Sequence, residues 1–207
     1  MVHLAAISQF PRYPGTIQHH EAQAYILNEI QALGHSPEIQ EIPSTASVGK
    51  LENILVRIEG TDADDAVLIM AHYDTESGTP GAGDNASGTA IVLEILHSIS
   101  GMATPENDII FLFTDGEEMG MLGAQAFVND HPWMSDVRIA INIDTITIGP
   151  AFMWQTSPEN GWLIQGDPTE GALLVAAAKA GLDLRQLQDD HPRLDAIPFE
   201  SQHQYMA

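Results

Sequence analysis

The stretch AVLIMAHYDT, which spans residues 66–75, decides the fold of this chain. Its first six residues form an unbroken apolar run of strand length, which is typical of a strand buried on both faces of a sheet. His72 and Asp74 follow the run directly. Because ligands bind beyond the carboxyl ends of the strands in open α/β sheets, the stretch predicts a buried strand that leads into a functional site.

Strand and helix patterns alternate on both sides of this stretch. Further strands are predicted at residues 38–42, 53–58, 108–114 and 137–143, with another candidate at 151–155. Helices are predicted at residues 18–33, 86–100, 119–128 and 169–180. A polar turn is predicted at 59–65, and a glycine- and proline-rich loop at 75–83. The alternation predicts a three-layer α/β/α architecture with a mixed, mostly parallel central sheet.

The length of 207 residues favours one domain, so we expect a single unit over 1–207. The pattern becomes polar and irregular over about residues 182–207, and no closing element is evident there. We therefore expect the C-terminal part to be incomplete or irregular.

Composition excludes several classes of function. Seven basic against 29 acidic residues give a formal net charge of −22, which repels nucleic-acid phosphates and anionic membranes. The absence of cysteine excludes disulfides, thiolate nucleophiles and cysteine-bound zinc. The longest apolar runs are far shorter than a membrane span, and the N-terminal residues lack the pattern of a signal peptide. We expect a soluble chain; compartment and oligomeric state stay open.

Acidic residues gather where the predicted strands end. Asp74 follows the first buried strand, Glu117 and Glu118 follow the second, and Asp144 follows the third. Asp84 lies between the glycine-rich loop and the next helix. Because parallel strands deliver their carboxyl ends to one edge of a sheet, we expect these carboxylates to lie close together.

This set of residues could build a hydrolytic zinc site. Zinc takes about four nitrogen or oxygen ligands and leaves a position for water, and a metal pair needs a bridging carboxylate. His72 and Asp74 are two residues apart on an extended segment, so Asp74 can orient the His72 ring. Glu117 and Glu118 point in different directions, so one can bind metal while the other acts as the general base.

Each residue also has an ordinary structural interpretation. Asp84 and its neighbours could cap a helix, Glu117 and Glu118 could favour a helix dipole, and Asp144 could belong to a turn. The pair His19–His20 is interpreted as a solvated helix start, and His97 as a helix residue without a ligand role. These separate interpretations do not explain why all the carboxylates share one edge.

Four motifs in order give the sequence a specific resemblance. They are HYDT at 72–75, PGAGDNASG at 80–88, FTDGEEMGMLGA at 113–124 and NIDT at 142–145, preceded by RYPGT at 12–16. Together they resemble the co-catalytic di-zinc aminopeptidases, metallopeptidase family 28, over roughly residues 5–165. Residues 131–164 are similar to the branch with membrane-anchored endoplasmic-reticulum and vacuolar proteases.

The resemblance implies a role for each residue. His72 and Asp144 would bind one zinc ion, Asp84 would bridge two, and Glu118 would bind the second. Glu117 would be the general base and Asp74 would support His72. The implied cofactor is a pair of Zn²⁺ ions, and the implied substrate is a peptide with a free N-terminus.

One departure from the family pattern affects the second zinc ion. The family supplies a final zinc-binding histidine in a Tyr-His-Thr-like segment, which this sequence lacks. His191 and His203 are the late candidates, and neither matches the motif. One zinc site is therefore expected to be short of a ligand, and the chain is expected to be truncated or diverged at its end.

The resemblance leaves alternatives beside aminopeptidase activity. They are a single-zinc acyl transferase of the glutaminyl-cyclase type, a catalytically impaired binding domain, and a di-zinc deacylase or carboxypeptidase. The segment DNASG at 84–88 fits the aminopeptidases better than the deacylases. Tyr73 and Met119 are expected to line the substrate pocket with Phe152 and Trp154, but the preferred side chain cannot be read from them.

Overall fold

The apolar run at residues 66–71 lies in β3 (Asp62–His72), a strand of a five-stranded sheet in the computed structural model. The model describes residues 2–42, 50–146, 153–155 and 162–164. The chain separates into two compact units, residues 1–145 and 146–207. The first unit contains the sheet and the residues predicted from the motifs to bind metal or act in catalysis, which are His72, Asp74, Asp84, Glu117, Glu118 and Asp144.

The elements of the first unit follow the predicted alternation. Its helices are α1 (Val2–Ile7), α2 (Ile17–Ala32), α3 (Ser87–Ser100) and α4 (Leu122–Asp130), with a π-type turn η1 (Ala82–Ala86) and a 3-10 turn η2 (Pro132–Asp136). Its other strands are β1 (Glu38–Ile42), β2 (Leu51–Ile58), β4 (Asn107–Thr114) and β5 (Val137–Asn142). In the second unit, β6 (Met153–Gln155) pairs with β7 (Trp162–Ile164). The predicted helix at 169–180 lies outside the described residues.

The sheet has the order β1-β2-β4-β3-β5. Strand β2 is antiparallel to both of its neighbours, whereas β3 is parallel to β4 and to β5. Four of the five strands in this sheet therefore run in one direction, which confirms the prediction of a mixed, mostly parallel sheet.

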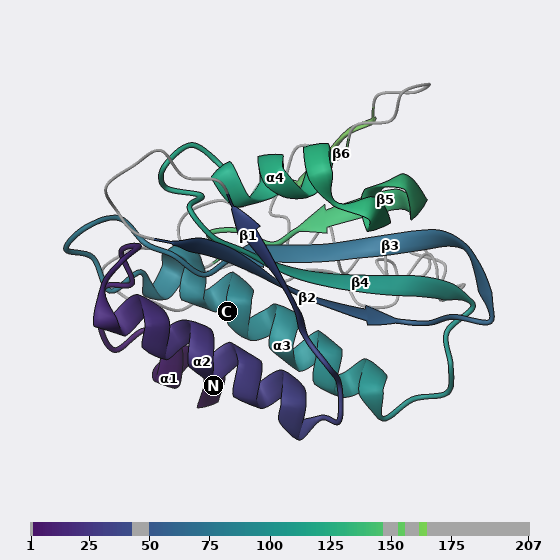
Figure 1. Cartoon of the computed structure of the whole chain (residues 1–207), viewed down its shortest axis with the longest axis horizontal. Coiled ribbons are helices and arrows are strands. Elements are labelled where there is room, and N and C mark those ends of the chain that lie inside the picture. The colour runs from purple at the N-terminus through teal and green to yellow at the C-terminus, as the bar shows by residue number, and fades with distance from the viewer. Residues whose placement is uncertain (1, 43–49, 147–152, 156–161, 165–207) are drawn as a thin grey trace, which may run out of the picture. The chain divides into compact units, whose positions relative to one another are not determined.

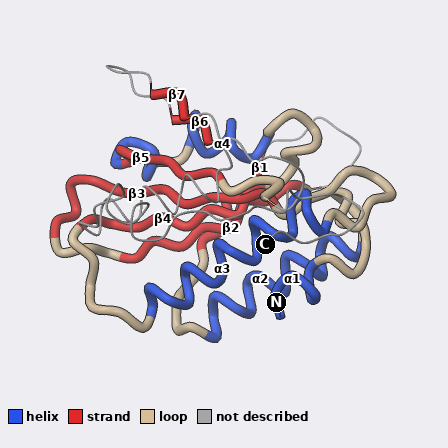
Figure 2. Tube along the Cα trace, turned by 180° about the vertical axis from the view of Figure 1, so that it is seen from behind, coloured by secondary structure: helices blue, strands red, loops and turns tan. Residues whose placement is uncertain are grey.

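The connections place helices on both faces of the sheet. Helix α3 connects β3 to β4 on one side, whereas α4 and η2 connect β4 to β5 on the other side of β3. Since parallel crossovers are right-handed, connections that move in opposite directions cover opposite faces. Figure 1 shows α1, α2 and α3 along one face and α4 along the other, and Figure 2 shows the same arrangement from behind. The connections that follow β3 and β4 therefore leave towards opposite faces of the sheet. In α/β proteins, ligands bind beyond the carboxyl ends of the strands at such a point.

A hydrophobic core lies on each face of the sheet. Ile69 and Ala71 of β3 pack with Phe111 and Phe113 of β4 under the buried side of α2 and α3. The alternate residues of these strands, such as Leu68 of β3, face the other side of the sheet and pack against Phe127 of α4. The two central strands are therefore buried on both faces, as the apolar run predicts.

Two predicted boundaries are wrong. Residues 62–65 are not a turn but the start of β3, because Asp62 pairs with Asn107 at the beginning of β4. Helix α4 begins at Leu122 rather than at 119, because Gly120 and Met121 have positive φ angles that interrupt a helix. Among the described residues, every helix is too short or too polar to cross a bilayer.

Candidate metal centre

The predicted site residues meet at the carboxyl edge of the three parallel strands. Tyr73 donates its backbone N–H to Thr114 at the end of β4 (3.0 Å), and Ile143 donates to Met70 of β3 (2.8 Å). These bonds hold the segments that follow β3, β4 and β5 side by side. His72, the Glu117–Glu118 pair and Asp144 consequently come from neighbouring chain segments.

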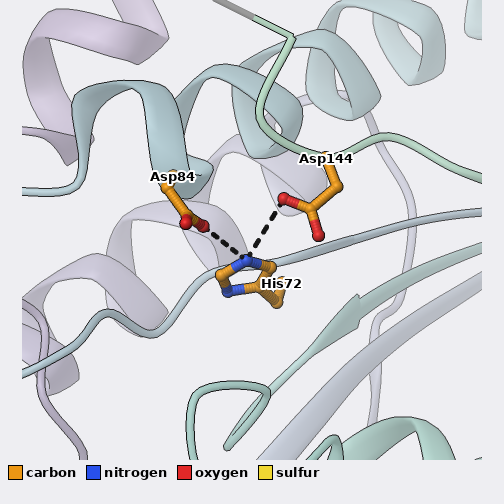
Figure 3. Close-up of side chains that lie close together, drawn as sticks. All are labelled: His72, Asp84 and Asp144. Carbon is orange, nitrogen blue, oxygen red and sulfur yellow. Dashed lines mark hydrogen bonds and ion pairs between the residues drawn. The ribbon is translucent and has the colours of Figure 1, made fainter. Parts of the chain in front are cut away.

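His72 lies between two carboxylates. Its side chain is buried, and Nε2 lies 3.0 Å from Oδ1 of Asp84 and 3.5 Å from Oδ1 of Asp144. Figure 3 shows both carboxylates directed towards the same ring nitrogen. The ligand atoms of the three residues lie within 4.8 Å of one another, so one ion could bind them together.

A second possible ligand group shares the same histidine. Suitable atoms of His72, Glu117 and Glu118 also lie within 4.8 Å of one another. The nearer carboxylate is that of Glu117, whose Oε2 lies 3.9 Å from Nε2 of His72. The two groups together contain the metal ligands predicted from the motifs, which are His72, Asp84, Glu118 and Asp144. The second group also contains Glu117, the predicted base.

Asp74 connects His72 to the segment that carries the predicted base. Its carboxylate is fully buried, and Oδ1 lies 3.3 Å from Nδ1 of His72. The same carboxylate accepts the backbone N–H groups of Glu117 (3.1 Å) and Glu118 (3.2 Å). Asp74 therefore contacts the segments after β3 and β4 at once, which the sequence interpretation did not anticipate.

Asn85 fixes the position of Asp84 relative to Asp144. It donates from Nδ2 to the carbonyl of Ile143 (2.9 Å) and accepts the N–H of Gly88 on Oδ1 (2.9 Å). A Cβ atom at Gly88 would collide with both Asn85 and the Ile143 carbonyl, so glycine is required at this close approach. The DNASG motif is thus a local structure that places Asp84 beside the end of β5.

The charges of the site favour a bound cation. Burial alone would lower the pKa of His72, but Asp144 and Asp74 outweigh it and raise the pKa to about 10. Burial raises the pKa of Glu117; His72 opposes this change, whereas Asp144 adds to it. Carboxylates crowded around one ring raise each other's pKa unless a cation joins them. A metal ion that binds Nε2 of His72 would have to displace the proton there, because a ligating imidazole is neutral.

An unpaired polar atom indicates that the residues fit a metal ion. Within the described part of the chain, Oδ1 of Asp144 is buried without a hydrogen-bond partner. A buried carboxylate oxygen costs free energy unless it binds a donor or a cation. Imidazole nitrogen and carboxylate oxygen are ligands that zinc accepts.

Three residues near the site were missed or misinterpreted. His19 is not solvated but buried, and its Nε2 lies 2.8 Å from Oδ1 of Asp115. Tyr73 cannot line a pocket, because its side chain is fully buried and donates to the Glu52 carbonyl. Arg12 is buried below the site and binds backbone carbonyls there. The RYPGT motif was the one sequence signal for Arg12. His97, interpreted as a helix residue without a ligand role, lies exposed on α3.

Comparison with known proteins agrees with this geometry. A family model described as Peptidase family M28 matches residues 53–206. Endoplasmic reticulum metallopeptidase 1 of Mus musculus is 35% identical over 124 residues, which cover 58% of this chain and 14% of that protein. A vacuolar membrane protease of Clavispora lusitaniae is 40% identical over 93 residues, which cover 44% of this chain and 9% of that protein. The chain thus spans a small part of the length of these relatives.

Solved structures show the same fold. Porphyromonas gingivalis glutaminyl cyclase aligns with a TM-score of 0.65 at 25% identity, covering 75% of this chain and 61% of that one. A Zn-dependent exopeptidase from Parabacteroides distasonis aligns with a TM-score of 0.63 at 25% identity, covering 74% and 63%. These neighbours confirm the α/β zinc-exopeptidase-like fold.

The solved neighbours place the chain in the class of zinc-exopeptidase-like folds. Within that class, the chain belongs to peptidase family M28.

Proposed function

We propose that this chain is a zinc-dependent aminopeptidase that removes the N-terminal residue of peptides. The observation that carries the proposal is the position of Nε2 of His72 between Asp84 and Asp144, with Glu117 and Glu118 beside it. Membership of the peptidase family supports the same class of substrate.

The first group gives His72, Asp84 and Asp144 as the ligands of one ion. The family resemblance implies that Glu118 would bind a second ion, with Asp84 as the shared ligand. When bound, zinc ions lower the pKa of water and polarise a carbonyl group. His191 and His203, the candidates for a last ligand, lie outside the described residues.

Glu117 is the residue we assign as general base. Its side chain is partly exposed (34%), so it can reach a substrate, and its backbone is held by Asp74. Its raised pKa brings it closer to neutral pH, where a carboxylate can accept a proton from attacking water and later release it. Glu117 would then donate this proton to the leaving amine, so the cycle ends with the base ready again.

A substrate with a free amine fits the charge of the site. The protonated α-amine is a cation, and the carboxylates of the site provide several negative groups that could receive it. Acetylation removes this charge and adds bulk, so an aminopeptidase rejects acetylated substrates. We therefore infer that the free N-terminus is the feature of the substrate that this site recognises.

The proposal is tested by a matched pair of substrates. We expect leucine p-nitroanilide to be hydrolysed and its N-acetyl form to be hydrolysed at least about a hundredfold more slowly, because a missing ionic contact disfavours the transition state. Activity should disappear with a chelator and return with added zinc. Equal hydrolysis of both substrates would contradict aminopeptidase specificity.

A second candidate is an acyl transferase that cyclises N-terminal glutamine, since a glutaminyl cyclase has the same fold at 25% identity. The two activities differ in their products from one peptide with N-terminal glutamine. The aminopeptidase releases free glutamine, whereas the cyclase releases ammonia and leaves a pyroglutamyl peptide. Detection of the pyroglutamyl peptide would favour the second candidate.

A further inference from the structure

His19 contacts the two chain segments that carry the candidate site, through Tyr73 and Asp115. It lies in the first turn of α2, and its side chain is 2% exposed. Its ring stacks on Tyr73, with 5.2 Å between centroids and 19° between planes. Its Nε2 lies 2.8 Å from Oδ1 of Asp115. Because an ionised carboxylate only accepts hydrogen bonds, Nε2 is the protonated nitrogen in this contact.

Asp115 anchors the segment that leads to the base and to Glu118. Its Oδ1 also accepts the N–H of Gly116 (2.9 Å), and its Oδ2 accepts the N–H of Glu52 in β2 (2.9 Å). Its own N–H donates to Oδ1 of Asn53 (3.1 Å). The start of the Asp-Gly-Glu-Glu segment is therefore bound to β2 and to α2 before it enters the site.

Tyr73 provides the corresponding anchor for the segment after β3. It lies between His72 and Asp74 in the sequence, and its hydroxyl donates to the carbonyl of Glu52 (2.8 Å). The backbone of Glu52 thus binds Asp115 through its N–H and Tyr73 through its carbonyl. The ring of His19 packs against Tyr73 and bonds to Asp115, so it joins the two anchors directly.

We propose that His19 is a positioning residue that holds the Glu117–Glu118 segment in register with His72, acting through Asp115 and Tyr73. This inference rests on the proposed function for its kinetic consequence, but it also predicts a change in metal binding. Residues that orient ligands without touching the metal change affinity or activity by about 10- to 100-fold when they are replaced.

Two substitutions separate the hydrogen bond from the packing. His19→Phe keeps a flat ring against Tyr73 but leaves Asp115 without its side-chain donor. His19→Gln keeps an N–H donor, although it loses the ring. The matched control is His97→Gln, because His97 is an exposed histidine of another helix, α3.

The measurements are zinc affinity, kcat and KM for the same anilide, and the unfolding midpoint, on the full chain. We expect His19→Phe to lower kcat at least about tenfold and to weaken zinc binding at least about tenfold, with KM changed less than about threefold. His19→Gln should recover most of both losses, and His97→Gln should match the original chain.

The outcomes distinguish this inference from the proposed function. A His19→Phe variant that only unfolds more easily, with unchanged kcat and zinc affinity, overturns the positioning role, and so does a glutamine variant without recovery. A chain that binds zinc but hydrolyses no anilide contradicts the proposed function alone, because the zinc affinities of the variants still decide the role of His19. A chain that binds no zinc contradicts both.

Discussion

Replacing Glu117 by glutamine is expected to abolish turnover of an amino-acid anilide while the zinc content stays unchanged. Glutamine keeps the size of the side chain but cannot accept the proton from water. General base catalysis contributes about 10²- to 10⁴-fold, so kcat should fall by at least about a hundredfold. The partial exposure of Glu117 (34%) and its backbone bond to Asp74 indicate that the loop tolerates the change.

The control for this variant is Glu106→Gln. Glu106 is exposed at the opposite end of β4, so the same chemical change there should leave kcat and zinc content unchanged. Steady-state kinetics and elemental analysis on the three proteins check the expectation. Substantial residual turnover by the Glu117 variant, within about tenfold of the original chain, would refute its role as base.

Replacing Arg12 by methionine is expected to cause the largest loss of stability. The Arg12 side chain is buried, and its guanidinium donates at 2.6 to 3.1 Å to a set of backbone carbonyls, those of Ile7, Tyr73, Pro80 and Gly81. Burial lowers the pKa of Arg12 to about 10, and the nearby Asp74 and Asp84 oppose that change. The group therefore stays charged at neutral pH.

Methionine has a similar length but donates no hydrogen bond, so several buried carbonyls would lose their partner. Each such loss costs about 1–3 kcal/mol, and the free energy of unfolding should fall by at least about 3 kcal/mol. Urea unfolding with a chelator present measures this value without a contribution from bound metal. Arg138→Met, which breaks an exposed pair with Asp65, should cost less than about 1 kcal/mol. Equal losses in the two variants would contradict the account.

The elements with strong apolar periodicity were predictable from the sequence. The strand at 38–42 was predicted to the residue, and β4 and β5 differ from their predictions by one residue. A long apolar run has one favourable environment, the buried middle of the sheet, so it defines the strand. The start of β3 was missed because three of the residues 62–65 are acidic, whereas the strand begins there because Asp62 pairs with Asn107 of β4.

The site residues that follow the ends of strands were predictable from the sequence. His72, Asp84 and Asp144 converge as the parallel topology predicts, and Glu117 and Glu118 lie beside them. Their catalytic and metal-binding roles remain predictions.

The residues behind the site could not be predicted in the same way. His19 is separated from Asp115 by 96 residues, and only the fold brings the two together. A polar residue at a helix start is usually solvated, so nothing local distinguishes this histidine from His20. The contacts of Arg12 were equally unpredictable, because its partners are backbone carbonyl groups, which every residue of the sequence has.

The most direct test of the account is the zinc content of the purified chain after dialysis against trace zinc. The proposal predicts about two zinc ions per chain, because His72, Asp84 and Asp144 provide ligands for one ion and the family pattern adds Glu118 for a second. That result would also require a last ligand from the residues beyond the described part, with His191 and His203 as candidates. About one ion or none per chain would contradict the co-catalytic site and favour a single-zinc or non-catalytic member of the family.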